Sequence, residues 1–454
     1  MRRIIPVALS IAGFDPDSGA GVVADIRTFN SLGVYGVAVV TVVTAQNTYR
    51  GYAIQPLDPG IVVAQLRALR EDIGFDAVKV GMVYTRELVE VISRELSDFE
   101  GPIVVDPLMK AKSGVELISE DALDALKNKL LHIATLVTPN KFEAEVLAET
   151  SIQTIEDAKR AAAIISREYG VEAVLVKGGH LKPCCIDILY FRGRYYEFWG
   201  KPSRGCYHGT GCILSSAITA LLAKGYELVE AVKKAKKHVE YAIRYGPPIG
   251  RGWCPADPLA PLEIDAERYR VLTDIVEAVK MLEHASHLVS KYVPEVGMQV
   301  AMSLPARYAS SPSDVAAIPG RIRADGCRLI YRLPPEFGVS SHLARAILTA
   351  MEFQPDIRAA INIAYSPEII RAAEKLGYIV SYYDRREEPP ELKRVEGATI
   401  PWGIRRAVER AGGKVPDIVY HLGDVGKEPM IVVFARSASE AASKLLRILW
   451  SIYG

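Results

Sequence analysis

The first 245 residues alternate short runs of β-branched residues with longer amphipathic stretches, and this alternation restricts the fold more than any other feature of the chain. It is typical of crossover units built around a mostly parallel sheet, in which a helix follows each strand and covers the sheet. We therefore predict an α/β fold for this half. The expected strands are the runs at 7–11, 37–43, 77–80, 103–105, 135–137 and 173–176.

Polar and glycine residues follow these predicted strands directly, as at Gly13, Gly81, Asp106, Asn140 and Gly178. In open α/β sheets, ligands bind in the crevice outside the carboxyl ends of the strands. We therefore expect one site assembled from many loops.

The length of 454 residues allows about three domains, or one large domain and one of medium size. With 49% apolar and 24% charged residues, the chain has enough hydrophobic surface to order throughout. Five prolines and three glycines lie between residues 246 and 262, a composition that continues neither helix nor strand. We predict a first domain at 1–246, a linker at 247–262 and a second, smaller α/β domain at 263–454.

The second segment repeats the mixture of helix and strand signals without an internal repeat. Apolar residues near helical spacing predict one long helix over 263–292, and further helices at 340–353, 367–376, 403–411 and 437–452. Strands are expected at 299–302, 329–331, 360–363, 379–382, 418–420 and 430–434.

Charge and hydropathy exclude several classes of partner. The formal net charge is +1, which argues against nucleic acid. No apolar run approaches the roughly 18 to 20 residues needed to cross a bilayer, and the first residues lack a signal-peptide pattern. We expect a cytoplasmic homo-oligomer that acts on small molecules. The six cysteines show neither a disulfide framework nor CxxC metal spacing, so an important cysteine here would be a reactive one.

The segment HGTGC at 208–212 precedes an apolar run of small residues at 213–223. Gly209, Thr210 and Gly211 would open a helix whose free backbone N–H groups and positive dipole end hold a phosphate group. Cys212 lies at the edge of this anion hole, where the dipole would lower its thiol pKa and favour a thiolate. Such a thiolate suits a base that takes a proton from a substrate hydroxyl. A glycine-rich turn with a buried cysteine is the alternative.

Further blocks occur in order along the same half of the chain. They are AGFDPDSGAGVVAD at 12–25, TAQNT at 44–48, KVGM at 79–82, VDP at 105–107, TPNKFE at 138–143 and VKGGH at 176–180. With HGTGC, this series closely resembles the hydroxymethylpyrimidine/phosphomethylpyrimidine kinase of thiamine biosynthesis, a ribokinase-like protein. The resemblance covers roughly residues 1–260. It departs from the family at Asp17-Ser18-Gly19-Ala20-Gly21, where the family usually has Ser-Gly-Gly-Ala-Gly.

The resemblance implies two successive phosphorylations of 4-amino-5-hydroxymethyl-2-methylpyrimidine, with ATP as phosphate donor. Asp25 and Gln46 would then hydrogen-bond the aminopyrimidine, while Met82 and Val105 pack on its ring. Leaving such polar groups buried and unpaired would cost free energy, so a site that contains them favours a ligand that forms hydrogen bonds with both. Pyridoxal kinase is the nearest rival, and Gln46 and the Met82 block argue against it.

The same resemblance assigns residues to the metal and to the transferred phosphate. Asn140 and Glu143 would orient hydrated Mg²⁺ through water, and Asp106 points into the same space. Lys177 would neutralise the charge of the transferring phosphate. From spacing alone, Asn140 and Glu143 equally suit an N-cap with a solvated acid in the first helical turn.

The second half resembles the thiamine-phosphate synthase domain found at the end of archaeal pyrimidine kinases. The resemblance lies in IPGRIR at 318–323, SSHLARA at 340–346, NIAY at 362–365, DR at 384–385 and GDVGKEP at 423–429. It implies condensation of the pyrimidine diphosphate with hydroxyethylthiazole phosphate, with release of pyrophosphate.

This chemistry needs residues that help pyrophosphate to leave. Arg321 offers a planar donor fork to the diphosphate, and His342 can donate a proton or a hydrogen bond to the leaving group. Asp384 and Glu428 are candidates for Mg²⁺ or thiazole contacts. A structural ion pair for Arg321 and a capping role for His342 remain open alternatives. A domain that senses thiamine phosphates without catalysis is the competing function.

Overall fold

The computed structural model describes residues 4–110, 116–180, 185–200, 205–424 and 426–453. The chain divides into two compact units, one ending at Leu262 and the other beginning at Glu263. Val425 of the GDVGKEP segment lies outside the described residues. Within the described residues, no helix combines the length and the apolar character that crossing a membrane requires.

A nine-stranded sheet organises the first unit, in the order β3-β2-β1-β4-β5-β6-β7-β8-β9. Neighbours from β2 through β1 and β4 to β7 pair in parallel, which confirms the expected α/β architecture. All six predicted strands are present, as β1 (Val7–Phe14), β2 (Tyr35–Asn47), β4 (Ala77–Val80), β5 (Ile103–Val105), β6 (Leu136–Val137) and β7 (Ala173–Val176).

Three antiparallel strands at the edges were not predicted. They are β3 (Arg50–Pro56), which pairs with β2, and the hairpin of β8 (Ile186–Phe191) and β9 (Arg194–Trp199) beside β7. Most residues of β3 and β9 are exposed, so these strands lack the continuous apolar run that marks a strand buried on both faces.

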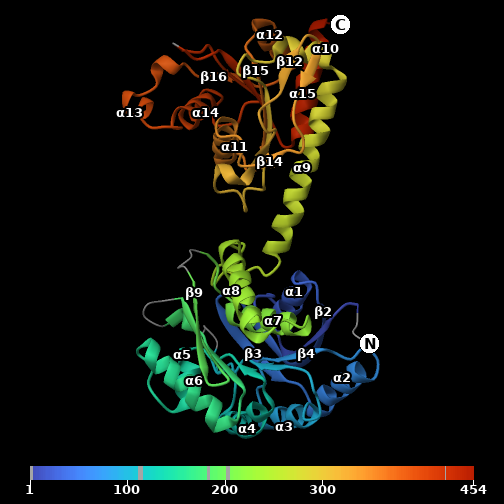
Figure 1. Ribbon diagram of the computed structural model, residues 1–454, viewed down its shortest axis with the longest axis vertical. Coiled ribbons are helices and arrows are strands. Elements are labelled where there is room, and N and C mark those ends of the chain that lie inside the picture. The colour runs from blue at the N-terminus through green and yellow to red at the C-terminus, as the bar shows by residue number, and fades with distance from the viewer. Residues whose placement is uncertain (1–3, 111–115, 181–184, 201–204, 425, 454) are drawn as a thin grey trace. The chain divides into compact units, whose positions relative to one another are not determined.

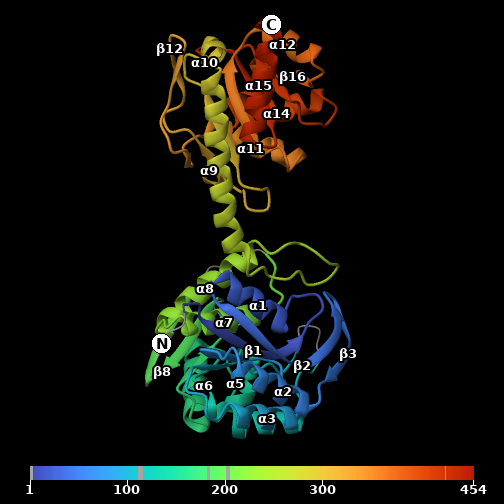
Figure 2. The ribbon, with the colours of Figure 1, turned by 90° about the vertical axis from the view of Figure 1, so that its right-hand side faces the viewer.

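Helices cover both faces of this sheet, as Figures 1 and 2 show. One face carries α1 (Gly21–Ser31), α7 (Thr210–Ala223) and α8 (Leu228–Arg244). The other carries α2 (Pro59–Glu71), α3 (Arg86–Glu95), α4 (Glu120–Ala125), α5 (Lys141–Ala148) and α6 (Ile155–Tyr169). Alternate strand residues divide between two cores: Val104 packs with α7 and α8, whereas Ile103 and Val105 face the opposite layer.

The Pro-rich segment that the sequence marks as a linker is attached to the first unit. Asp257 forms an ion pair with Arg27 at 2.7 Å, and Ala256 is buried against Ile213. Pro and Gly residues show that a segment has no regular structure, but they do not show whether it is free of the domain before it.

The second unit contains a seven-stranded sheet in the order β14-β11-β10-β15-β18-β17-β16. Its strands are β10 (Gln299–Ser303), β11 (Val315–Ala317), β14 (Glu336–Phe337), β15 (Ala359–Ala364), β16 (Val380–Tyr382), β17 (Ile418–His421) and β18 (Met430–Ala435). Neighbouring strands are antiparallel except β16 and β17. The strand expected at 329–331 instead forms β13 (Arg328–Ile330), in a separate hairpin with β12 (Arg323–Asp325).

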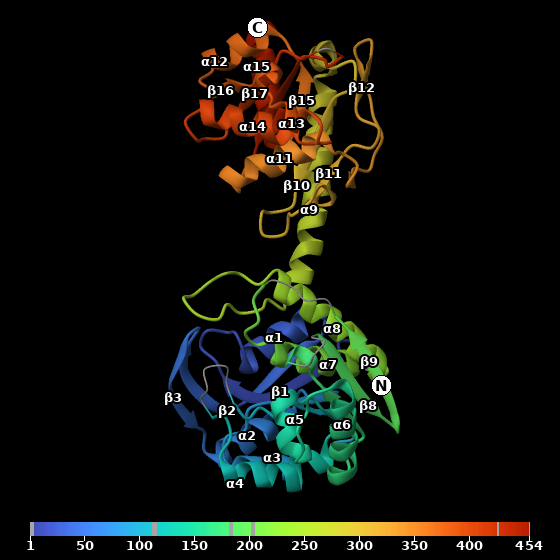
Figure 3. The same ribbon diagram turned by 90° about the vertical axis from the view of Figure 1, so that its left-hand side faces the viewer.

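Helices on the two faces of this second sheet match the predicted segments. On one face, α11 (His342–Phe353) and α14 (Thr399–Arg410) share a core with β10 and β15 (Figure 3). On the other lie α12 (Pro367–Lys375) and α15 (Ala438–Tyr453). The long helix α9 (Ala260–His284) lies beside α15, whose first turn is capped by Asp274. It ends earlier than predicted and is followed by α10 (Ser286–Val289).

Candidate active sites

A cavity of about 420 Å³ opens in the first unit, where the loops after the parallel strands meet. Its walls draw on segments distant in sequence, from the loop after β1 to helix α8. Nine of the site residues predicted for this half line it: Gln46, Met82, Asn140, Glu143, Lys177, Gly209, Thr210, Gly211 and Cys212. The expectation of one site built from many loops is therefore met.

The N-terminus of α7 has the form expected of an anion hole. Gly209 is its N-cap, with φ of 78°, and among the described residues no side chain caps the helix. A Cβ on Gly209 would lie 1.7 Å from the Gly19 carbonyl oxygen, so only glycine fits where the first loop meets this turn. The first backbone N–H groups of α7 are thus left for a ligand that lines up with the helix dipole.

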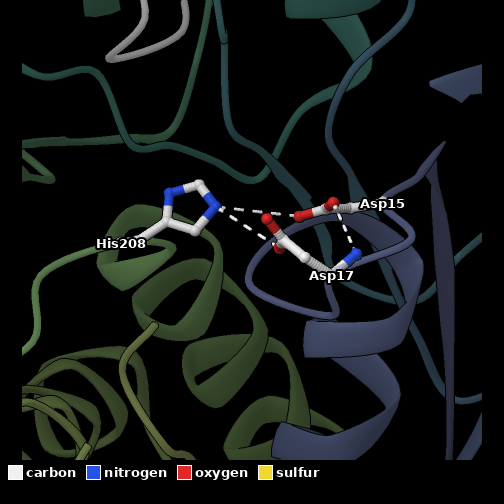
Figure 4. A group of neighbouring side chains, drawn as sticks. All are labelled: Asp15, Asp17 and His208. Atoms are coloured by element: carbon white, nitrogen blue, oxygen red, sulfur yellow. Dashed lines mark hydrogen bonds and ion pairs between the residues drawn. The ribbon is translucent and has the colours of Figure 1, made fainter. Parts of the chain in front are cut away.

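The first loop, where the sequence departs from the family pattern, closes against the HGTGC segment. Asp15 accepts hydrogen bonds from the backbone N–H groups of Asp17 and Ala20. Figure 4 shows His208 directed at both carboxylates, with its Nε2 3.7 Å from Asp15 and 3.8 Å from Asp17. The altered run Asp17-Ser18-Gly19-Ala20-Gly21 therefore still forms a compact loop at the edge of the cavity.

Cys212 lies in the first turn of α7 and is buried. The expectation of a lowered thiol pKa is wrong: burial raises the pKa of Cys212 to about 11, and the carboxylates of Asp25 and Asp106 act in the same direction. The charge of Lys79 and a hydrogen bond from the Gly21 backbone N–H lower that pKa, but they do not outweigh burial. The helix dipole can be read from sequence, whereas the desolvation of the sulfur cannot.

A charged cluster adjoins the start of α7. Lys177 Nζ lies 2.7 Å from Asp106 Oδ1 and 3.8 Å from Glu143 Oε2. A Cβ on Gly211 would lie 3.3 Å from Lys177 Nζ, which places the ammonium beside the anion hole. Burial acts to lower the pKa of Lys177, but the two carboxylates outweigh it and raise that pKa above its ordinary value. Lys177 therefore stays charged where a transferred phosphate would lie.

Glu143 is both a capping residue and a buried acid. Asn140 and Glu143 form a capping box at the start of α5, with Asn140 N–H donating to Glu143 Oε2 at 2.7 Å. The N-cap arrangement that the sequence also allows is therefore present, and both residues line the cavity as well. Burial, opposed by Lys177 and reinforced by Asp106, raises the pKa of Glu143 to about 7.

The predicted pyrimidine contacts fall into two groups. Gln46 and Met82 line the cavity, whereas Asp25 and Val105 are fully buried and do not. Both carboxylate oxygens of Asp25 are bound by protein donors, with Lys79 Nζ at 2.7 Å. Asp106 is also fully buried and lies beneath the lining. The family resemblance named these residues, but it could not show which of their side chains reach the surface of the cavity.

Cys206 and Cys254 form a disulfide, contrary to the expectation that the cysteines build no disulfide framework. They are 48 residues apart, and they meet because His208 pairs with Pro255 in an isolated β-bridge. The bond joins the segment before α7 to the Pro-rich segment. Spacing in the sequence gave no signal for this pair.

In the second unit, Arg321 and His342 lie near each other. Arg321 follows Gly320 in a tight turn where both have positive φ, and its Nη1 donates to the Val296 carbonyl at 2.9 Å. His342 begins α11, whose N-cap Ser341 makes no side-chain capping bond. Burial lowers the pKa of His342, and the positive charges of nearby basic residues lower it further; these are Arg321, Arg345, Lys427 and Arg385.

Three of these four cations were not singled out from the sequence. Arg345, Arg385 and Lys427 lie in the segments SSHLARA, DR and GDVGKEP. These segments were identified from the sequence, but other residues within them were chosen as site candidates. The fold brings the four cations together around one histidine. A group of like charges beside an uncapped helix N-terminus is suited to a polyanionic ligand.

Asp384 and Glu428, by contrast, have structural partners. Arg386 binds Asp384 through its side chain and lowers the pKa of that carboxyl to about 2. Glu428 accepts hydrogen bonds from the backbone N–H groups of Glu295 and Val296. Glu428 thus fixes the segment whose Val296 carbonyl holds Arg321.

Comparison with known proteins agrees with this division of the chain. The family model for phosphomethylpyrimidine kinase matches residues 15–257, and the model for thiamine-phosphate synthase ThiN matches residues 274–447. The bifunctional thiamine biosynthesis protein ThiDN of Methanocaldococcus jannaschii is 34% identical over 452 residues, which are 98% of this chain and 99% of that protein.

Two further relatives match the first unit. The hydroxymethylpyrimidine/phosphomethylpyrimidine kinase of Aquifex aeolicus is 43% identical over 250 residues, 54% of this chain and 98% of that protein. The pyridoxal kinase of Staphylococcus aureus, solved with pyridoxal, is 33% identical with a TM-score of 0.53, covering 58% of this chain and 96% of that one. The expected ribokinase-like fold is therefore confirmed. The chain belongs to the family of bifunctional thiamine biosynthesis proteins, in which a hydroxymethylpyrimidine and phosphomethylpyrimidine kinase is joined to a thiamine-phosphate synthase.

Proposed function

We propose that the first unit phosphorylates 4-amino-5-hydroxymethyl-2-methylpyrimidine twice with ATP, and that the second unit joins the resulting diphosphate to hydroxyethylthiazole phosphate. The observation that carries the kinase assignment is the uncapped N-terminus of α7, with Cys212 in its first turn, inside a cavity that also holds Gln46 and Met82. Anion binding and proton removal are thus available at one place.

The kinase roles follow from the positions of the side chains. The Gln46 amide supplies both a donor and an acceptor for the aminopyrimidine, and Met82 supplies apolar contact with the ring. The first N–H groups of α7 and the ammonium of Lys177 bind the transferring phosphate as negative charge develops. Cys212, in its thiolate form, accepts the proton of the hydroxymethyl group as the hydroxymethyl oxygen attacks phosphorus. Asp25 and Val105 lie behind the cavity wall, so they support the site without touching the pyrimidine.

Mg²⁺ fits the acidic cluster on the charge of its donors. Asp106 and Glu143 are two buried carboxylates that both lie near the ammonium of Lys177, so one formal negative charge of these three groups is left for a cation to offset. Carboxylate oxygen is the ligand type that Mg²⁺ prefers. Glu143 and Asn140, which line the cavity, would hold the hydrated ion with the charge of Asp106 behind them, and the ion would supply electrostatic stabilisation of the ATP phosphates.

The pKa of Glu143 gives a stability prediction with a defined sign. Because the folded-state pKa is raised from 4.5 to about 7, the folded chain keeps a proton that the unfolded chain has already lost between these values. Stability contributed by this group is complete below the unfolded pKa and is lost as the pH rises through the folded one.

The melting temperature of Glu143→Gln should therefore rise relative to that of the wild type as the pH increases from about 5.5 to about 8, measured by calorimetry without metal. Added Mg²⁺ should raise the melting temperature of the wild type at the higher pH more than that of the variant. A melting-temperature difference that does not change with pH would show that Glu143 does not titrate in this range.

The synthase assignment rests on the cations around His342. Arg321, Arg345, Arg385 and Lys427 are suited to hold the diphosphate of the pyrimidine substrate. Burial and, beside it, these charges lower the pKa of His342 and so favour its neutral form while the site is free of anions. A bound diphosphate offsets those charges and favours protonation of His342, which can then donate to the departing pyrophosphate. The aminopyrimidine itself stabilises the positive carbon that forms.

Several coarser features complete the proposal. We place the kinase in residues 1–246 and the synthase in 263–454, with 247–262 attached to the kinase through Asp257 and Cys254. We further propose a cytoplasmic homo-oligomer that binds small molecules and no nucleic acid, in keeping with a net charge of +1.

The kinase proposal is tested by the products formed from hydroxymethylpyrimidine, ATP and Mg²⁺, separated by mass spectrometry. We expect the monophosphate first and the diphosphate later. Pyridoxal, the ligand of one structural relative, is the matched alternative substrate. If pyridoxal is phosphorylated with the higher kcat/KM, the assignment of Gln46 and Met82 to an aminopyrimidine is wrong.

A further inference from the structure

Lys79, near the end of β4, is a fully buried cation to which the mechanism above gives no part. Its Nζ lies 2.7 Å from Asp25 Oδ2, and both side chains have 0% exposure. Ser10 and Ser216 donate to the same carboxylate at 2.5 and 2.6 Å. A buried ion pair often contributes no more stability than apolar residues of the same size. Stability alone is therefore a weak reason for a charge at this position.

The ion pair lies on the side of α7 that presents Cys212. Ser216, which binds Asp25, follows Cys212 by four residues and so lies on the same face of the helix. Lys79 and Cys212 both line the cavity, and a Cβ on Gly81 would come within 2.8 Å of Lys79 Nζ, so the backbone leaves room for the ammonium. Burial acts to lower the pKa of Lys79, but Asp25, Cys212 and Asp106 together outweigh it and raise that pKa, so the ammonium stays charged.

The cysteine itself needs such a group. Burial raises the pKa of Cys212 to about 11, and Lys79 is the largest influence that acts against burial. The Gly21 backbone N–H adds a hydrogen bond to the sulfur. Lys79 and this backbone donor favour the thiolate and so limit the rise of the Cys212 pKa, although burial, Asp25 and Asp106 together still outweigh them.

We propose that Lys79 is a positioning residue for the first phosphorylation, holding a fixed positive charge beside Cys212 that favours its thiolate inside the cavity. This inference rests on the proposed kinase function. In the step concerned, the thiolate takes the hydroxymethyl proton, the alkoxide oxygen bonds to the γ-phosphorus of ATP, and the bond to the β–γ bridging oxygen breaks to release ADP. The thiol then returns its proton to solvent.

The second phosphorylation provides an internal control. Its nucleophile is a phosphate oxygen that is already ionised at neutral pH, so it does not need a base. A residue that acts through the Cys212 thiolate should affect the first step far more than the second. A residue with a purely structural role should affect both steps alike.

The test is the pH profile of kcat/KM for each step in Lys79→Met of the full chain. The midpoint of the first step should move up by at least about one pH unit, with a roughly tenfold loss at neutral pH, while the second step changes less than about threefold. Lys79→Met/Asp25→Asn, which leaves no unpaired buried carboxylate, should also show a raised midpoint. Arg27→Met, which breaks the Arg27–Asp257 pair away from the cavity lining, should leave both profiles unchanged.

Alkylation of Cys212 by iodoacetamide, followed by mass spectrometry of its peptide, gives a readout that needs no kinase activity. Its pH midpoint should rise in Lys79→Met and not in Arg27→Met. Unmoved midpoints in both assays, or equal losses in both phosphorylations, would overturn the role of Lys79. A wild-type chain that alkylates as expected but does not phosphorylate hydroxymethylpyrimidine would refute the proposed function instead.

Discussion

Cys212→Ala should slow the phosphorylation of hydroxymethylpyrimidine by roughly 10² to 10⁴-fold, the usual contribution of a general base, while ATP and the pyrimidine still bind. The anion hole is built from backbone N–H groups of α7, which the substitution leaves in place. The second phosphorylation should suffer less, since its attacking phosphate oxygen needs no base. Single-turnover rates with each substrate measure the two steps separately.

The matched control for this prediction is Cys327→Ala. Cys327 is a free, exposed cysteine of the second unit, so its loss should leave both kinase rates unchanged. An unchanged first phosphorylation in Cys212→Ala would remove Cys212 from the mechanism. Equal losses in the two steps would point to damage of the anion hole rather than loss of a base.

Arg321→Ala and His342→Ala should each reduce thiamine phosphate formation by about 10²-fold or more when the pyrimidine diphosphate is supplied directly, as expected for removing a group that stabilises developing charge. Both variants should keep the two kinase activities, because both residues belong to the second unit. Arg321→Lys should also be poor, since an ammonium cannot present the two parallel donors of a guanidinium. Initial rates of thiamine phosphate formation provide the measurement.

Arg405→Ala serves as the arginine control for the synthase. Arg405 forms a surface ion pair with Glu352, which lies ten residues, or about 15 Å, along α11 from His342. Such exposed pairs contribute little to stability. Near-normal synthase rates in Arg321→Ala and His342→Ala, with the fold intact, would reopen the choice of catalytic residues.

For helix α7, the sequence predicted the local backbone geometry correctly but not the pKa of its cysteine. Two glycines before an apolar run predict a helix with a free N-terminus, and that local geometry is present. The predicted direction of the Cys212 pKa shift was wrong. The shift depends on burial and on the charges of Asp25, Asp106 and Lys79, which lie in other segments of the sequence. A short segment of sequence determines the local backbone geometry, whereas the desolvation of a side chain depends on how the whole domain packs around it.

The same distinction explains the other differences. Buried parallel strands such as β5 leave a continuous apolar run, but the mostly exposed edge strand β9 leaves none. Asp384 and Glu428 carry the right chemistry for a ligand, yet Arg386 and two backbone N–H groups already bind them. Which acids remain available to a ligand is decided by partners that only the fold brings near.

The most direct test of the whole account supplies the full chain with hydroxymethylpyrimidine, ATP, Mg²⁺ and hydroxyethylthiazole phosphate, and follows the products by mass spectrometry. We expect thiamine phosphate and pyrophosphate, preceded by the pyrimidine monophosphate and diphosphate. Accumulation of the diphosphate without thiamine phosphate, together with tight binding of added thiamine phosphate, would contradict the account and identify the second unit as a sensor.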